Sequence, residues 1–199
     1  MKKIFLFIFI FLHFYSVSLA ENLKFKKIVS LDKPWGSSFI SNDEIIITEK
    51  SGKIKIVNIL TGDVNEIKHN LNFLEYGQGG LLDILYKDNF IYISYTENRE
   101  NWKTSTSIAK AKLDKKNLLF KNIFQANPPI DSGYHFGSRL AIKDNYLFAS
   151  AGERGKGMIA QDASKHPGSI IRIHLDGSIP KDNPRFEGKS KWLPEIYQI

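Results

Sequence analysis

Cysteine is absent from this sequence of 199 residues, and its absence excludes several classes of protein. Without cysteine there can be no disulfide framework, no thiolate metal site and no cysteine nucleophile, so a hydrophobic core has to hold the fold together. Sustained helical periodicity is also missing. These absences argue against a small disulfide-stapled module and against a helical bundle.

Long apolar runs are confined to the first twenty residues. Lys2 and Lys3 precede an almost wholly apolar segment over residues 4–15, and small residues stand at Ser18 and Ala20. This order is typical of a secretory signal peptide cleaved between Ala20 and Glu21, although an uncleaved N-terminal anchor stays open. The apolar segment is short for a membrane span. We therefore expect residues 21–199 to form the mature domain, periplasmic or secreted, with no stable membrane insertion.

Acidic residues are fewer than basic ones, which gives a formal net charge of +7. The lysines are scattered, and several occupy alternate positions of strand-like stretches. A nucleic-acid groove would need clustered basic residues interleaved with exposed aromatics. The charge therefore argues against nucleic acid as a partner while still favouring anionic partners or ligands.

Short runs rich in Ile, Tyr, Phe and Val dominate the rest of the chain, and Asp, Asn and Gly bound them. This composition predicts an all-β fold. The expected strands cover residues 44–48, 54–59, 90–95, 107–113, 146–150 and 169–175, with fourth strands of their units at 63–69 or 118–124.

These strands recur in three similar units. Each unit has a glycine-led strand, a tight Asp/Asn turn, a second strand, a loop and a third strand. The turn residues Asp43, Asp88 and Asp144 lie 45 and 56 positions apart, a period that suits the blades of a β-propeller of about 40–50 residues each. The units span residues 34–57, 78–111 and 135–173.

Three blades do not close a propeller, because an open stack leaves strand edges and one blade face bare. The segment 192–197, close to the last residue Ile199, resembles the opening of a fourth inner strand. We therefore expect the first three blades and the start of a fourth, as the N-terminal part of a longer protein.

Two polar residues occupy equivalent positions at the heads of the second and third units. Gln78 lies ten residues before Asp88, and His135 lies nine before Asp144. Loops that enter the inner strands gather at one mouth of a propeller, so these side chains should converge there. A neutral imidazole can accept a proton and an amide can orient a hydroxyl, but each could equally serve the structure.

Other polar residues give weaker signals. The segment 153–155 is compatible with a salt-bridged loop or with the rim of a site. Asp162 and His166 are four residues apart, but Pro167 argues against a helix that would hold both as metal ligands. His69 and His174 are expected to be solvated.

Seven ordered segments of the chain resemble the motifs of the glucose/sorbosone dehydrogenases, the soluble aldose sugar dehydrogenases that use pyrroloquinoline quinone (PQQ). The resemblance covers residues 30–199. The segments are Pro-Trp-Gly at 34–36, Gly-Gln-Gly-Gly-Leu-Leu-Asp at 77–83, His-Phe-Gly-Ser-Arg-Leu at 135–140, Gly-Glu-Arg-Gly at 152–155, Ala-Gln-Asp at 160–162, His-Pro-Gly-Ser-Ile-Ile-Arg at 166–172 and Asp-Gly-Ser-Ile-Pro-Lys-Asp-Asn-Pro at 176–184.

The resemblance implies a six-bladed propeller with PQQ at its axial mouth, assisted by calcium. It implies that His135 is the base that takes the anomeric proton while hydride passes to the quinone, that Gln78 contacts the sugar, and that a lactone results. An external electron acceptor would reoxidise the cofactor.

The chain also departs from the family pattern at two positions. Tyr134 stands where the glucose-oxidising branch has an acidic residue, which is closer to the aldose branch of broader specificity. Glu153 replaces the aspartate of a Gly-Asp-Arg-Gly segment. The family's Gly-His-Arg-Asn segment, its calcium ligands and its main PQQ contacts lie beyond Ile199, so no metal or PQQ ligand is assigned here.

Two other functions remain open on the sequence. A non-catalytic propeller could bind carbohydrate or a protein partner with the same fold. A propeller hydrolase or lactonase would need an acidic metal cluster at the axis, and the sequence has no such spacing.

Overall fold

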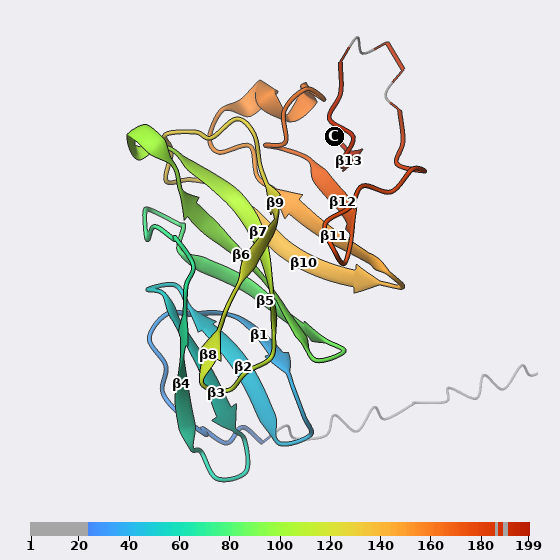
Figure 1. Ribbon diagram of the computed structural model, residues 1–199. Helices are drawn as coiled ribbons and strands as arrows, with labels where there is room; N and C mark the ends of the chain where they lie inside the picture. The colour runs from blue at the N-terminus through green and yellow to red at the C-terminus, as the bar shows by residue number, and fades with distance from the viewer. Residues whose placement is uncertain (1–23, 186, 189–190) are drawn as a thin grey trace, which may run out of the picture.

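The computed structural model describes residues 24–185, 187–188 and 191–199. Its described part contains strands, two short 3-10 helices and connecting loops (Figure 1). The expected signal peptide and its cleavage point lie outside the described residues. Within the described ranges, no helix has the length and apolar character that a membrane crossing requires.

The strands form three antiparallel sheets that follow one another along the chain, each with a core of four strands. Since the first three strands of each sheet come from one sequence unit, the three predicted blades are confirmed. The first blade contains β1 (Pro34–Phe39), β2 (Glu44–Glu49), β3 (Lys53–Asn58) and β4 (Val64–His69); the second contains β5 (Leu81–Lys87), β6 (Phe90–Asn98), β7 (Thr104–Lys112) and β9 (Lys121–Gln125); the third contains β10 (Gly137–Lys143), β11 (Tyr146–Ala151), β12 (Ile170–His174) and β13 (Ile196–Gln198).

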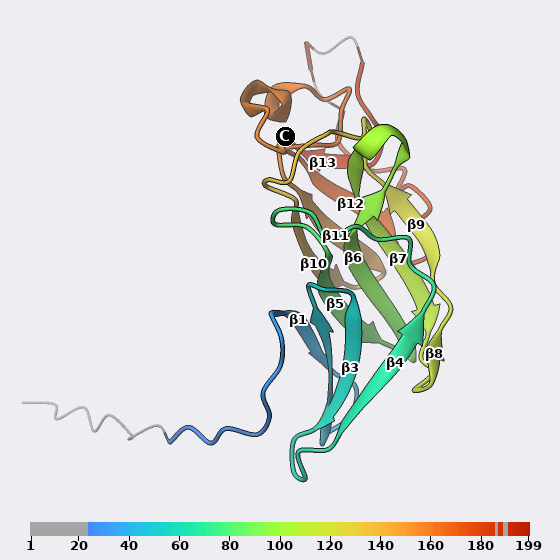
Figure 2. The same ribbon diagram turned by 90° about the vertical axis from the view of Figure 1, so that its left-hand side faces the viewer.

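The three blades stand side by side, with β1 packed on β5 and β5 packed on β10 (Figures 1 and 2). Two-residue turns join the first two strands of the second and third blades. Asp88 and Asn89 both have positive φ, at 50° and 66°. Such a pair matches the twist of a hairpin, which is why Asp-Asn serves at this position.

Two details of the strand prediction are wrong. Residues 192–197 do not open a fourth inner strand, because β13 pairs with β12 as the outer strand of the third blade. Residues 118–124 do not form one strand either. Their first part belongs to β8 (Asn117–Leu118), which pairs in parallel with β4 of the first blade, and only the later part joins β9 in the second.

Each inner strand carries an irregularity in its pairing with the second strand. The register shifts fall between Pro34 and Ser37 in β1, between Leu81 and Ile84 in β5, and between Gly137 and Leu140 in β10. A bulge bends its strand and takes local backbone groups out of the ladder. These groups therefore need other hydrogen-bond partners.

Hydroxyl groups on the second strands provide those partners and join neighbouring blades. Thr48 donates to the carbonyl of Leu82 at 2.5 Å, and Ser94 donates to the carbonyl of Ser138 at 2.6 Å. Each hydroxyl also accepts, at 3.0 Å, the peptide N–H of a bulge residue in its own blade. The same bond from each second strand to the next blade thus fixes how successive blades stack.

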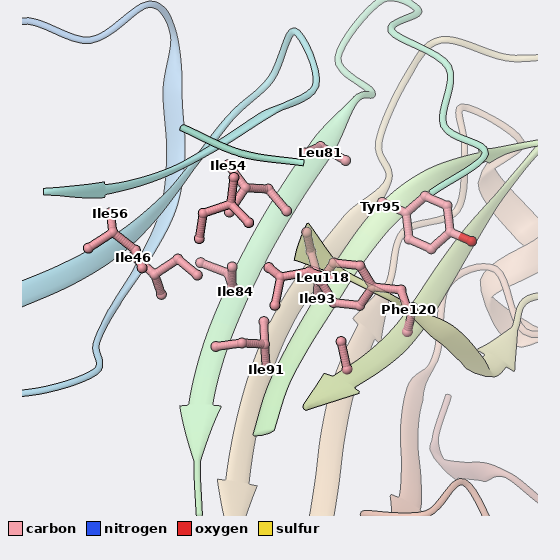
Figure 3. Packing of buried hydrophobic residues seen from close by; sticks show 13 residues of the cluster. Ile46, Ile54, Ile56, Leu81, Ile84, Ile91, Ile93, Tyr95, Leu118 and Phe120 are labelled. Carbon is pink, nitrogen blue, oxygen red and sulfur yellow. The ribbon is translucent and has the colours of Figure 1, made fainter. Parts of the chain in front are cut away.

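Apolar side chains fill both spaces between the blades. Ile46 and Ile54 of the first blade pack with Ile84, Ile91 and Ile93 of the second (Figure 3). The alternate residues of the second blade face the other way, with Tyr92 and Ile108 packed against Leu140, Leu147 and Ile171 of the third. Successive side chains of a strand point to opposite faces, so a blade between two others needs a continuous apolar run such as 91–93.

Candidate functional site

The candidate site lies where three connections meet at one end of the blades. The β4–β5 connection carries Gln78, the β9–β10 connection carries His135, and the β11–β12 connection carries Glu153. Hydrogen bonds join all three segments. The end of the propeller reached by these connections is the mouth predicted from the repeats.

Gln78 and His135 are in direct contact. The peptide N–H of His135 donates to Oε1 of Gln78 at 2.9 Å, and the peptide N–H of Gln78 donates to the carbonyl of Gly133 at 2.7 Å. The predicted convergence of these two residues from neighbouring blades is therefore confirmed. Because the Gln78 oxygen is occupied by the His135 backbone, its amide nitrogen is the group left to meet a ligand.

The backbone at His135 is held in an unusual conformation. Its φ is +48°, in the left-handed region that costs energy for a residue with a side chain. Gly152 makes this possible, because a Cβ there would lie 1.9 Å from the carbonyl oxygen of His135. The turn presents the imidazole outward, with 54% of the side chain exposed.

Glu153 binds the imidazole from the β11–β12 connection. Its Oε1 is hydrogen bonded to Nδ1 of His135 and also accepts the peptide N–H of Gly155 at 3.0 Å. The hydrogen bond to His135 lowers the pKa of the Glu153 carboxyl, although partial burial acts in the opposite direction. An ionised carboxylate at Nδ1 holds the proton there, which leaves Nε2 as the acceptor. Among the described residues, Nε2 of His135 has no hydrogen-bond partner.

Arg154 holds the loop that carries the imidazole. Its guanidinium donates to the carbonyl of Tyr134 at 2.9 Å, to the hydroxyl of Thr104 at 2.7 Å and to the carbonyl of Ser132, and it lies 3.6 Å from the centre of the Phe136 ring. Only 2% of Arg154 is exposed, and this burial lowers its pKa to about 10, against the attraction of Glu153. The second blade and the His135 loop are thereby tied to one fixed group.

The roles of Glu153 and Arg154 are not predicted by the sequence. Their segment was expected to be a salt-bridged loop or the rim of a site, and both descriptions hold in part. A positional signal was available, because Glu153 lies nine residues after Asp144 and His135 lies nine before it. Two strands that leave and re-enter one hairpin bring such positions to the same end of the sheet.

The other histidines within residues 24–199 that the structure describes do not join this site. His166 is 3% exposed, accepts the peptide N–H of Asn127 through Nδ1 and lies 3.3 Å from Glu195 through Nε2, so it does not form a metal pair with Asp162. His69 is partly buried with Nε2 2.7 Å from the carbonyl of Gly52, so the expectation of a solvated side chain is wrong for it. His174 stacks on Tyr146 at the far end of β12. Within the described ranges, no three His, Asp or Glu side chains come together as metal ligands.

The site and fold define a class: a β-propeller with an exposed, carboxylate-oriented histidine at one mouth and an amide beside it. Such a pair can take a proton from a bound hydroxyl. Comparison with known proteins identifies the family. A family model described as glucose/sorbosone dehydrogenase matches residues 31–199, and the chain belongs to this family.

Three relatives illustrate the match. The chain is 32% identical over 164 residues to the aldose sugar dehydrogenase YliI of Escherichia coli, covering 77% of this chain and 44% of that protein. It is 28% identical over 206 residues to quinoprotein glucose dehydrogenase B of Acinetobacter calcoaceticus, covering 85% and 43%. The PQQ-bound aldose sugar dehydrogenase of Streptomyces coelicolor matches with a TM-score of 0.71 and 25% identity, covering 84% and 50%.

The chain therefore spans about half the length of the relatives it matches. The three blades of this chain match about half of each relative, which agrees with six blades in a propeller of full length.

Proposed function

We propose that the full-length protein oxidises aldose sugars to lactones, with PQQ as hydride acceptor and His135 as the base. The observation that supports this best is the pairing of His135 with Glu153 in an exposed position. The carboxylate orients the ring, and Nε2 faces outward where a sugar hydroxyl can approach. The quinoprotein and PQQ-bound relatives supply the cofactor in this proposal.

Each group has a defined task in the reaction. Nε2 of His135 takes the proton of the anomeric hydroxyl as the bond from that oxygen to the anomeric carbon becomes a double bond. PQQ, when bound, supplies the two-electron acceptor for the hydride that leaves the same carbon. Glu153 stabilises the positive charge that the imidazole acquires. The Gln78 amide nitrogen donates to a sugar oxygen and orients the ring.

The residues of this chain fit the substrate side of such a site, because the exposed imidazole oriented by Glu153 could act as the base for a bound sugar hydroxyl. PQQ, when bound, would supply the hydride acceptor. Calcium is part of the proposal because the family resemblance implies it. The described residues bring no group of metal ligands together, so no step is assigned to the metal.

The proposal extends to location and partners. The predicted signal peptide supports a periplasmic or secreted protein, not inserted in the membrane once cleaved, and an external electron acceptor would reoxidise the cofactor. Scattered lysines argue against nucleic acid as a partner.

The experiment is a titration of the full-length protein with PQQ and calcium, followed by dye reduction with aldoses. Saturable PQQ uptake with sugar-dependent dye reduction is the expected result. Saturable sugar binding without any PQQ uptake would instead favour the second function, a non-catalytic propeller that binds carbohydrate or a protein. One fold can host many unrelated functions, so the fold alone does not decide between the two.

A further inference from the structure

Lys50 is a largely buried lysine of the first blade that contacts the loop carrying Gln78. It directly follows β2 and enters the short β2–β3 connection. Only 18% of its side chain is exposed, and its Nζ donates to the carbonyl of Gly77 at 2.5 Å. An ammonium that leaves water loses favourable hydration, so it needs a strong partner where it is buried. Here that partner is the residue directly before Gln78.

The peptide group between Gly77 and Gln78 is held from both sides. Its carbonyl accepts the hydrogen bond from Lys50, and its N–H donates to the carbonyl of Gly133 at 2.7 Å. A trans peptide is planar, with its C=O and N–H pointing in opposite directions, so two such bonds fix the orientation of the plane. The Cα of Gln78 belongs to this plane. The direction in which the Gln78 side chain leaves the loop is therefore set partly by an ammonium of the neighbouring blade.

Lys50 also holds the far end of the same loop, through its backbone. The carbonyl of Lys50 accepts the peptide N–H of Leu81 at 3.2 Å. Gly80 allows this approach, because a Cβ there would lie 2.1 Å from that carbonyl oxygen. One residue of the first blade thus bridges the segment 77–81, which carries Gln78.

The Gln78 side chain is fixed at its own end as well. Its Oε1 accepts the peptide N–H of His135 at 2.9 Å, which leaves the amide nitrogen to meet a ligand. Without the ammonium of Lys50, the peptide plane before Gln78 can turn about its remaining bond to Gly133. The amide nitrogen then loses its fixed direction, and a hydrogen bond weakens steeply as its angle departs from linear.

Glu75 lies near the ammonium of Lys50 but does not replace the bond to Gly77. Its Oε1 is 3.9 Å from Nζ of Lys50 and 3.6 Å from Nζ of Lys33. Both distances are too long for a hydrogen bond, so the carboxylate compensates charge without fixing direction. Among the described residues, the carbonyl of Gly77 is the one hydrogen-bond partner of this ammonium. A side chain without a donor would lose it.

We propose that Lys50 is a positioning residue for sugar binding, which aims the Gln78 amide at the substrate by fixing the peptide group before it. The inference rests on the proposed function, since the sugar meets Gln78 only in that proposal. The bond from Gln78 holds the sugar in the ground state and in the transition state alike, so its loss raises KM and leaves kcat nearly unchanged. Loss of Glu153, in contrast, lowers kcat.

Steady-state dye reduction with glucose in the full-length holoenzyme tests the proposal. Lys50→Met nearly keeps the length of the side chain and removes the donor, and it should raise KM about fivefold, the value of one hydrogen bond. Lys50→Arg keeps a donor and should recover part of the loss. Lys53→Met is the matched control, because 53% of the Lys53 side chain is exposed. An unchanged KM in Lys50→Met would overturn the positioning role.

A double-mutant cycle shows whether Lys50 acts through Gln78 or through the stability of the fold. Gln78→Ala should raise KM at least as much as Lys50→Met does, and the two changes together should raise it no further than Gln78→Ala alone. A general loosening of the blade would add to the effect of Gln78→Ala. KM increases that multiply in the double variant would therefore contradict the proposal.

A binding measurement separates failure of this inference from failure of the proposed function. Methyl glucoside keeps the glucose ring but carries a methyl group on its anomeric oxygen, so no proton can be taken there. Calorimetric titration of the full-length protein should give a Kd that rises about fivefold in Lys50→Met. This result in a protein that oxidises no sugar would sink the dehydrogenase proposal and keep the role of Lys50. Glucose oxidation with equal Kd values in wild type and Lys50→Met would do the reverse.

Discussion

Glu153 fixes the His135 imidazole through Nδ1, and this single contact decides which nitrogen can accept a proton. The contact depends on loop geometry, since His135 has positive φ and Gly152 lies against its carbonyl. Arg154, directly after Glu153, holds the same loop by donating to the backbone carbonyls of Ser132 and Tyr134. Glu153 therefore positions the imidazole ring, and Arg154 positions the backbone that carries it.

Replacing Glu153 with glutamine should lower kcat about 10²-fold, because a neutral amide cannot stabilise the charge that the imidazole acquires. The KM for the sugar should change little, since Gln78 is untouched. Steady-state dye reduction with the holoenzyme measures both values. Glu66→Gln, on the exposed strand β4, is the control for loss of one carboxylate. A Glu153→Gln protein as fast as wild type would remove Glu153 from the mechanism.

Of the contacts in the candidate site, one could be predicted from the sequence and another could not. Counting from the turn aspartates was enough to bring Gln78 and His135 together, because repeated units place equivalent positions at one mouth. The contact between Glu153 and His135, in contrast, depends on the backbone conformation of the loops that carry the two residues. Positive φ at a histidine is not encoded in any pattern of hydrophobic and polar residues, so the partner of Nδ1 could not be predicted.

The blades were predicted well because their strands are short runs rich in Ile, Tyr, Phe and Val and their Asp/Asn turns recur. Segments 118–124 and 192–197 were predicted wrongly for a common reason. Each is a short outer segment, and pairing with a strand from an earlier part of the chain decides its place. β8 joins the first blade through two residues only, and such long-range pairing leaves little trace in the local sequence.

Ser94 links strands of two neighbouring blades, and its loss has a clear expected effect on stability. Its hydroxyl accepts the N–H of Asp83 and donates to the carbonyl of Ser138, and all three residues are buried. Ser94→Ala leaves both backbone groups unpaired between two blades. The free energy of unfolding should fall by about 2 kcal/mol.

Urea unfolding of the full-length protein measures this loss. Ser30→Ala makes the same chemical change on an exposed segment before β1 and should leave the urea midpoint unchanged. Equal midpoints for Ser94→Ala and wild type would show that the hydroxyl does not join the blades.

Across the whole molecule, several paired carboxyls make stability depend on pH. The pKa of Glu195 is lowered mainly by its hydrogen bond with His166, against partial burial. Burial raises the pKa of Glu49, but its bonds to Lys55 and to the peptide N–H of Asp32 outweigh that, and the net shift is downward. Glu153 is lowered as well.

In the unfolded chain each of these glutamates titrates near 4.5. A lowered folded pKa contributes stability that is present above the unfolded value and is lost as pH falls through the folded value. The urea midpoint should therefore hold steady from about pH 7 to about pH 5.5 and fall below about pH 4.5. Glu195→Gln should make the fall shallower. A midpoint that stays constant down to about pH 3.5 would contradict these pairings.

Proton transfer to His135 is tested by comparing the wild-type protein with a variant that lacks the imidazole. Wild-type and His135→Ala full-length proteins are loaded with PQQ and calcium, PQQ uptake is checked by absorbance, and dye reduction with an aldose is followed. We expect equal PQQ uptake and a kcat about 10³-fold lower in the variant. An unchanged rate in His135→Ala at equal PQQ content would contradict this expectation.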